Sequence, residues 1–318
     1  YTREPRMLRS DRERGTIEMV IAMLLSGTIG YFVLSSEQPF WHVVFFRCLI
    51  GAGSLLVYML ITQSLRFPTL EAGAVAFILL GGVTLVGNWV LLFASFAHVP
   101  FSIATIAYHM QPILLVILSA FLSHQLPSRH IIFWLFMAVI GLGLVVGLSP
   151  RELWHMMRTD SLSVSLFWGV ILALGAAMLY AITTLLTKHV SHIPSPMIAL
   201  IHVLTGCVLL LPMVDFQHLP TEAGQWGDLL VLGTLNTGVL YILLYSAFQK
   251  LTTTLIAALS FIYPVTALVV DYFAFGHAVN VLQVTGIVLI LLAVCAVKFN
   301  WKLSRLMPGS ALKNDSSE

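Results

Sequence analysis

Ten long apolar runs constrain this chain more than any other feature of its sequence. They lie at about residues 17–34, 40–62, 70–96, 101–122, 130–148, 163–187, 196–214, 227–248, 253–275 and 279–299. A helix needs about 20 apolar residues to cross a bilayer, and a helical segment satisfies its own backbone hydrogen bonds in lipid. The sequence therefore predicts an all-α, polytopic membrane protein with ten transmembrane helices.

The composition excludes a soluble protein of this size. Hydrophobic residues make up 58% of the chain and charged residues 9%, against about 25% charged residues in soluble domains. The three cysteines, Cys48, Cys207 and Cys295, lie inside apolar runs, where they form neither a disulfide framework nor a metal-binding pair. We expect no cofactor, no metal and no nucleic acid, and the expected partners are the bilayer and a small molecule. Whether the chain is a monomer or an oligomer stays open.

Lysine and arginine residues predict the orientation. The segments between the ten spans lie alternately on the two sides of the membrane. Those on one side hold only Arg151 and Arg158. The opposite set holds Arg3, Arg6, Arg9, Arg12, Arg14, Arg66, Arg129, Lys188, Lys250, Lys298, Lys302, Arg305 and Lys313. Because cytoplasmic segments are enriched in positive charge, both termini are expected in the cytoplasm of a multi-pass protein of the bacterial inner membrane. The first run reads as a retained helix, since no cleavage site of a signal peptide is evident.

Two stretches, 97–125 and 249–277, have the same design. Each begins with a short polar segment, continues as a long apolar run, and carries one proline near its middle, Pro112 or Pro264. Polar residues recur at helical spacing along one face of each stretch. Proline removes a backbone hydrogen bond, and lipid tolerates this only beside protein or a water-filled cavity. We therefore expect both helices to line a central polar pathway and to bend at these prolines.

A second pair of matching segments indicates a repeat of five helices. Residues 39–51 align with residues 194–206, so that Arg47 corresponds to His202. Because five is an odd number, the second half must be inverted relative to the first. The expected organisation is a basic cytoplasmic N-terminal tail, a first five-helix repeat, an outer loop, a second five-helix repeat and a cytoplasmic C-terminal tail, at residues 1–15, 16–148, 149–162, 163–299 and 300–318.

These features together resemble a known family. Ten spans in two halves, the aromatic-arginine pair Phe46-Arg47 in the second span, and Pro112 and Pro264 in the middle of equivalent helices are similar to the drug/metabolite transporter (DMT) superfamily. Within it, the chain resembles EamA-domain carriers and YddG-type amino-acid exporters over residues 16–299. The segment 26–31 departs from the usual Trp-Gly opening of the first span. The resemblance implies a central cavity lined by the first, third, fourth, sixth, eighth and ninth helices.

Three ionisable residues inside spans have alternative interpretations. His109, one turn before Pro112, could relay a proton or bind a substrate carboxylate, or it could be a neutral histidine bonded to a carbonyl that the proline frees. Arg47 and Asp271 are expected at similar depth and could form a structural ion pair. Alternatively, Arg47 binds a substrate carboxylate and Asp271 takes part in coupling. Gly143 and Gly147 form a GxxxG spacing, which predicts close helix packing.

The candidate substrate-binding residues combine amides, hydroxyls, one imidazole and aromatic rings. They are Asn88, Trp89, Tyr108, His109, Gln111, Tyr180, Asn236, Tyr241, Ser260 and Tyr263. Such a lining suits a zwitterion with an apolar side chain, so the expected function is export of amino acids, aromatic or otherwise neutral, by alternating access. The alternative is a transporter of drugs or of other metabolites, nucleoside-like or cationic. A channel or a membrane-bound enzyme is a remote alternative, because neither charged pore rings nor catalytic motifs are present.

Overall fold

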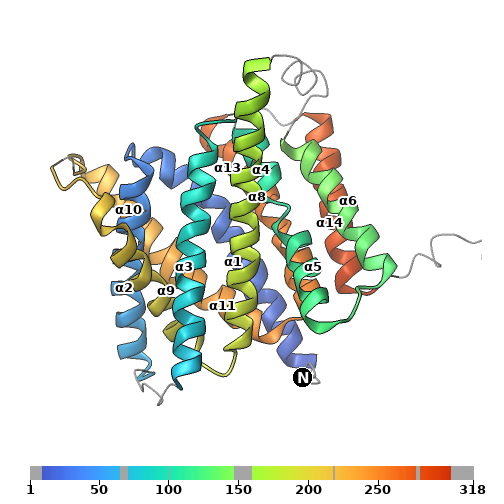
Figure 1. Ribbon diagram of the computed structural model, residues 1–318, viewed down its shortest axis with the longest axis horizontal. Coiled ribbons are helices and arrows are strands. Elements are labelled where there is room, and N and C mark those ends of the chain that lie inside the picture. The colour runs from blue at the N-terminus through green and yellow to red at the C-terminus, as the bar shows by residue number, and fades with distance from the viewer. Residues whose placement is uncertain are drawn as a thin grey trace, which may run out of the picture.

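The computed structural model describes residues 9–64, 71–99, 101–146, 160–217, 219–276 and 280–301. Within these ranges every regular element is a helix, and ten spans are long and apolar enough to cross a membrane (Figure 1). The elements are α1 (Arg9–Ser35), α2 (Phe40–Ile61), α3 (Ala72–Ser95), α4 (Phe101–Tyr108), α5 (Gln111–Ser123), α6 (Arg129–Val146), α8 (Asp160–His189), α9 (Ser195–Leu210), η1 (Leu211–Met213), α10 (Ala223–Gly233), η2 (Thr234–Val239), α11 (Leu240–Lys250), α12 (Thr253–Ser260), α13 (Ile262–Phe275) and α14 (Val281–Lys298). The predicted all-α fold with ten spans is confirmed.

The ends of the chain differ in detail from the sequence-based expectation. Helix α1 begins at Arg9, inside the predicted polar tail 1–15. Most of the predicted loop 149–162 and of the C-terminal tail 300–318 lies outside the described residues.

The fourth and ninth spans are each divided into two helices. Helix α4 ends at Tyr108 and α5 begins at Gln111, whereas α12 ends at Ser260 and α13 begins at Ile262. Each break lies just before the central proline, because a proline lacks the N–H group that would continue the helical hydrogen bonding and its ring crowds the preceding turn. The prolines then occupy the first turn of α5 and α13, where a missing N–H is tolerated.

The eighth span contains an irregularity that the sequence did not reveal. Residues Thr234–Val239 form a π-helix, η2, between α10 and α11. In a π-helix each carbonyl is bonded five residues ahead, which inserts an extra residue into the turn and frequently marks a functional site.

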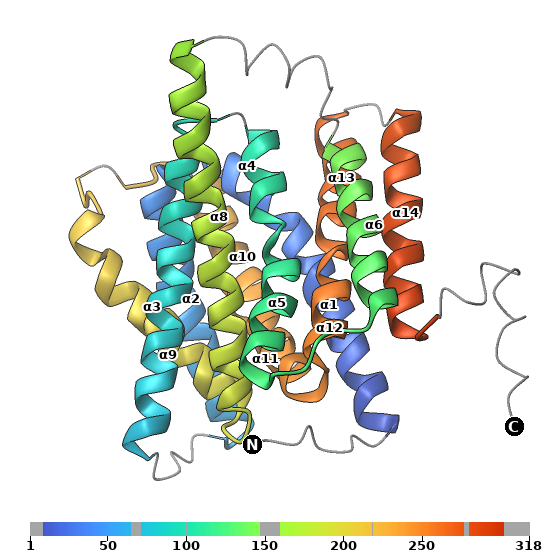
Figure 2. The same ribbon diagram turned by 45° about the vertical axis from the view of Figure 1, so that its right-hand side comes forward.

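Helix packing follows the symmetry between the two halves. Helix α2 packs against α9, and α6 packs along α14, so equivalent spans are paired with each other. The pairing of α3 with α8 has its counterpart in the pairing of α1 with α10 and α11. Figure 2 shows that α1 begins at the lower end of the view and that α8, its counterpart, begins at the upper end. The halves are therefore inverted relative to each other.

Glycine allows the last spans of the two halves to approach closely. A Cβ atom added to Gly286 in α14 would lie 2.5 Å from the carbonyl oxygen of Gly141 in α6, and one added to Gly141 would lie 2.8 Å from that of Gly286. Gly143, which the GxxxG spacing suggested as a packing residue, faces open space, and Gly147 lies outside the described residues. The close helix contact is thus made by Gly141 and not by Gly143, which lies on a different face of α6.

Replacing Gly286 with alanine should lower the thermal stability of the detergent-solubilised protein. The added methyl group meets a backbone oxygen, which cannot rotate away, so α6 and α14 must separate at a cost of about 1–3 kcal/mol. The measurement is the midpoint of thermal unfolding. Gly143→Ala is the matched control and should leave the midpoint unchanged; equal midpoints for both variants would show that this contact does not limit packing.

Candidate functional site

The predicted substrate-binding residues lie on the elements around the two helix breaks and the π-helix. Asn88 and Trp89 lie on α3, Tyr180 lies on α8, and Tyr241 lies on α11. The remaining candidates are at the breaks or in the π-helix: Tyr108, His109, Gln111, Asn236, Ser260 and Tyr263. The site is therefore built from both halves of the chain.

Aromatic rings form a continuous group in this region. The ring of Tyr108 stacks on that of Tyr180, with centroids 6.2 Å apart, and its edge meets His109 at 5.7 Å. The imidazole of His109 stacks on Tyr263 at 5.0 Å and 11° between planes. Tyr241 of the eighth span lies near Tyr108. These contacts join the fourth, sixth, eighth and ninth spans through their rings.

Several tyrosine hydroxyl groups in this group are available to a ligand. Those of Tyr180, Tyr241 and Tyr263 make no hydrogen bond within the described part of the chain, and none of them is sealed from solvent. Asn88 lies within reach of the hydroxyl of Tyr108. Since a buried hydroxyl without a partner is costly, these unpaired hydroxyls are candidates for hydrogen bonds to a ligand.

His109 has a defined hydrogen bond. Its Nδ1 lies 2.8 Å from the carbonyl oxygen of Thr105, one turn earlier in α4. A carbonyl can only accept, so Nδ1 carries the proton, and in the neutral imidazole Nε2 is an acceptor. The carbonyl that His109 bonds is therefore that of Thr105 and not one freed by Pro112.

Two buried amides each leave one oxygen without a partner. Asn88 donates from Nδ2 to the carbonyl of Leu85 at 3.1 Å, and Asn236 donates to Leu25 and Thr28 at 2.6 and 2.8 Å. The Oδ1 atoms of both side chains are buried and have no hydrogen bond. Such unsatisfied buried acceptors are rare in folded proteins, which makes both oxygens candidates for binding a ligand donor.

Two other predicted residues are less available. The hydroxyl of Ser260 donates to the carbonyl of Ile256 at 2.9 Å, within its own helix. Gln111 is buried at the start of α5. Both residues lie beside the helix breaks, but Ser260 already uses its donor.

The suggested ion pair between Arg47 and Asp271 is wrong for this structure. The guanidinium of Arg47 donates from Nε to the hydroxyl of Thr237 at 3.2 Å and from Nη2 to the carbonyl of Asn236 at 3.3 Å. It also lies over the ring of Trp89, 5.0 Å from the centroid. Helix α2 packs on α9, α10 and η2, whereas α13 packs on α1, α6 and α14. The two side chains therefore lie on helices with different neighbours.

His202, the counterpart of Arg47 in the second half, is sealed inside the bundle. It is 1% exposed, and its Nδ1 lies 2.7 Å from the hydroxyl of Tyr245. Its Nε2 is buried without a hydrogen bond and faces Gly81. The two halves thus place a basic residue at equivalent positions but in different surroundings.

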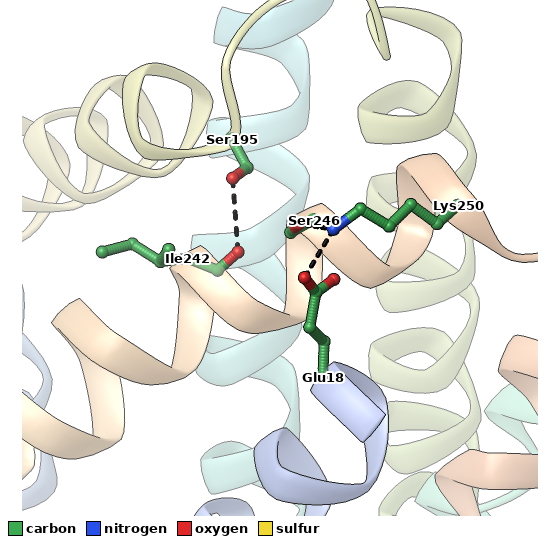
Figure 3. Close-up of polar contacts among 5 residues, drawn as sticks. All are labelled: Glu18, Ser195, Ile242, Ser246 and Lys250. Carbon is green, nitrogen blue, oxygen red and sulfur yellow. Dashed lines mark hydrogen bonds and ion pairs between the residues drawn. The ribbon is translucent and has the colours of Figure 1, made fainter. Parts of the chain in front are cut away.

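A polar network at the N-terminal end of the bundle escaped the sequence analysis. Figure 3 shows the carboxylate of Glu18 from α1 directed at the ammonium of Lys250 from α11, which also contacts the hydroxyl of Ser246 at 2.7 Å. Nearby, Ser195 donates to the carbonyl of Ile242 at 3.3 Å. The signal available in the sequence was Glu18 itself, an acid at the start of the first apolar run.

The two ends of the divided spans are packed differently. At the end where α1 begins, α5 packs against α12, and the side chains of α12 from Leu255 to Leu259 are buried (Figure 2). Among the described residues, α4 and α13 share no comparable packing at the opposite end, and residues 265–271 of α13 are half-buried or exposed. The two divided spans are thus packed together more closely at the end where α1 begins than at the other end.

Comparison with known proteins agrees with this architecture. The model of the EamA-like transporter family matches residues 14–147 and 167–299. The chain is 28% identical to the uncharacterised transporter YxxF of Bacillus subtilis over 288 residues, covering 90% of each protein. It is 29% identical to the pseudopaline exporter CntI of Pseudomonas aeruginosa over 265 residues, covering 83% of this chain and 87% of that one.

A solved crystal structure has the same fold. It superposes with a TM-score of 0.76 at 18% sequence identity, covering 92% of this chain and 98% of the other. With ten apolar spans, a divided helix in each half and the family model matching most of its length, the chain belongs to the EamA-like transporter family and is a multi-pass membrane transporter.

Proposed function

We propose that this transporter exports neutral amino acids, aromatic ones among them, by alternating access. The observation that carries the proposal is the group of available donors and acceptors among stacked aromatic rings at the two helix breaks. Ligand sites of this kind combine apolar walls with a few convergent polar groups.

A zwitterionic amino acid needs polar partners of both kinds. The Oδ1 atoms of Asn88 and Asn236 and the Nε2 atom of His109 are acceptors that suit an ammonium group. The unpaired hydroxyls of Tyr241 and Tyr263 are donors that suit a carboxylate. The rings of Tyr108 and the other tyrosines offer flat apolar surface for the substrate side chain.

The divided spans support an alternating-access cycle. In an inverted repeat, one half can adopt the conformation of the other, which exchanges the open and the closed end. Here α5 and α12 are packed together, and the equivalent segments α4 and α13 are not. In the opposite state α4 and α13 would meet and α5 and α12 would separate, with bending at Pro112 and Pro264.

Positive charge supports an outward-open assignment of this conformation. Arg12 bonds the carbonyl of Lys298, and Lys188 bonds that of Leu251, so these cations and Lys250 gather at the closed end. The positive-inside rule assigns that end, with both termini, to the cytoplasm. Export is further supported by the similarity to a relative that is named as an exporter.

The multidrug alternative has one supporting observation and one against it. Stacked tyrosines can hold a lipophilic cation through cation–π interactions. Arg47, however, interacts electrostatically with Tyr241 and Tyr263, and its positive charge would repel such a ligand. We therefore prefer the zwitterion.

Transport by purified protein in lipid vesicles tests the substrate class. We expect saturable movement of Phe, Met or Thr, reduced at least about tenfold by Asn88→Ala or Tyr241→Ala, because each removes a polar partner worth about 1–3 kcal/mol. Tyr58→Ala is the matched control, since Tyr58 is 41% exposed on α2. Transport of a lipophilic cation without any response to amino acids would select the multidrug alternative, and flux that rises without saturation would indicate a channel.

Replacing either central proline should slow transport while leaving the protein folded. Alanine restores the missing N–H, so Pro112→Ala or Pro264→Ala allows the divided span to close into one straight helix and biases the cycle toward one state. Initial transport rates and thermal unfolding midpoints are compared with those of Pro194→Ala, where the proline caps the start of α9 instead of interrupting a span. Wild-type rates in both variants would contradict the hinge assignment.

A further inference from the structure

We infer that Arg47 is the residue that recognises the substrate carboxylate, with its Nη1 amino group directed at the ligand. The inference rests on the proposed function, because it assumes that an amino acid occupies the site between the two helix breaks. It assigns a specificity-determining role to a side chain outside the six helices expected to line the cavity.

The guanidinium of Arg47 is held in position on two sides. Nε and Nη2 are bonded to the hydroxyl of Thr237 and the carbonyl of Asn236, both in the π-helix η2. The ring of Trp89 covers one face of the group. A guanidinium carries five N–H donors in a rigid fork, so these contacts fix its orientation and leave donors unused.

The unused donors are not sealed. Although Arg47 is only 5% exposed, its Nη1 atom has no partner among the described residues and keeps contact with solvent. Arg47 also lies close to Tyr241 and Tyr263, whose hydroxyls are unpaired within the described part of the chain. The inference assigns the free side of the guanidinium to the space beside these tyrosines.

The positive charge of Arg47 has no acidic partner in the described part of the chain. Its two hydrogen bonds are to a neutral hydroxyl and a neutral carbonyl. Glu18, a half-buried acid near the start of α1, is paired with Lys250. An unneutralised cation inside a span is expensive and normally marks a ligand or ion pathway. A bound carboxylate supplies the missing countercharge and matches the geometry of the guanidinium fork.

The second half of the chain offers an internal comparison. His202 occupies the equivalent position, but its unpaired Nε2 is sealed against Gly81 and its Nδ1 is bonded to Tyr245. A side chain that serves only to join spans can thus be enclosed at this position. Arg47 differs in keeping an accessible donor beside the ligand-binding tyrosines.

The test compares a substrate with its neutral-carboxyl analogue. Phenylalanine and phenylalaninamide share the ammonium group and the ring, and only the first has a carboxylate. Binding is measured as ligand-induced thermal stabilisation of the purified protein at increasing ligand concentration. We expect wild type to bind the acid about 10- to 100-fold more tightly, the range for hydrogen bonds to a charged group. Arg47→Gln should bind both equally, and Arg129→Gln, on the surface at the start of α6, should behave as wild type.

Each outcome bears on the inference. Equal binding of acid and amide by wild type overturns it while leaving amino-acid transport intact, and so does a preference for the acid that survives in Arg47→Gln. If wild type binds neither phenylalanine nor any other acid–amide pair of amino acids, the proposed function fails and the inference fails with it. If Arg47→Gln does not fold, the same comparison of acid and amide is made with Thr237→Val. This variant loses the hydrogen bond that positions Nε of Arg47, so its preference for the acid should fall at least about threefold; an unchanged preference would overturn the inference.

Discussion

The backbone of a membrane span must satisfy its own hydrogen bonds. In this protein, the turns at which a helix leaves some of them unmade determine where polar groups lie. Lipid offers no partner to a free N–H or carbonyl group, so each irregular turn has to lie inside the bundle. Three such turns occur in the described residues, at the breaks after Tyr108 and Ser260 and in the π-helix Thr234–Val239. The candidate site lies among these three turns, because there the bundle must supply polar partners.

Much of the fold followed from the sequence because helix length, helix period and the proline positions are local properties. A stretch of about 20 apolar residues must span, and Pro112 and Pro264 must interrupt a helix wherever it packs. The site was harder to predict. Arg47 and Asp271 were expected to meet because of their positions along their spans, but which face of a helix meets which neighbour depends on packing. The π-helix likewise leaves no mark in the residue pattern, so the contact between Arg47 and Asn236 was not foreseen.

Glycine residues allow helices of the two halves to pack closely against each other. Gly82 packs against Thr205 and Gly233 packs against Ile50, and these two contacts exchange when the halves are interchanged. Polar residues are distributed less evenly. The first half contributes Arg47 with an accessible donor, and the second contributes His202 in a sealed contact with Tyr245. The backbone symmetry thus permits two related states, while the side chains make the ligand surface of those states different.

The two ends of the bundle are also held by different kinds of polar contact. At the N-terminal end the segment before α12 is held by the Glu18–Lys250 pair and by the bond from Lys188 to the carbonyl of Leu251. In the first half, the equivalent segment precedes α4. There the hydroxyl of Ser165 donates a neutral hydrogen bond to the carbonyl of His98. Lys250 and Glu18 keep 24% and 15% exposure, so water can partly replace their contact and the pair contributes little, about 1 kcal/mol. In the proposed alternating-access cycle, a ligand could outweigh a contact of that size through modest differential binding to the two states.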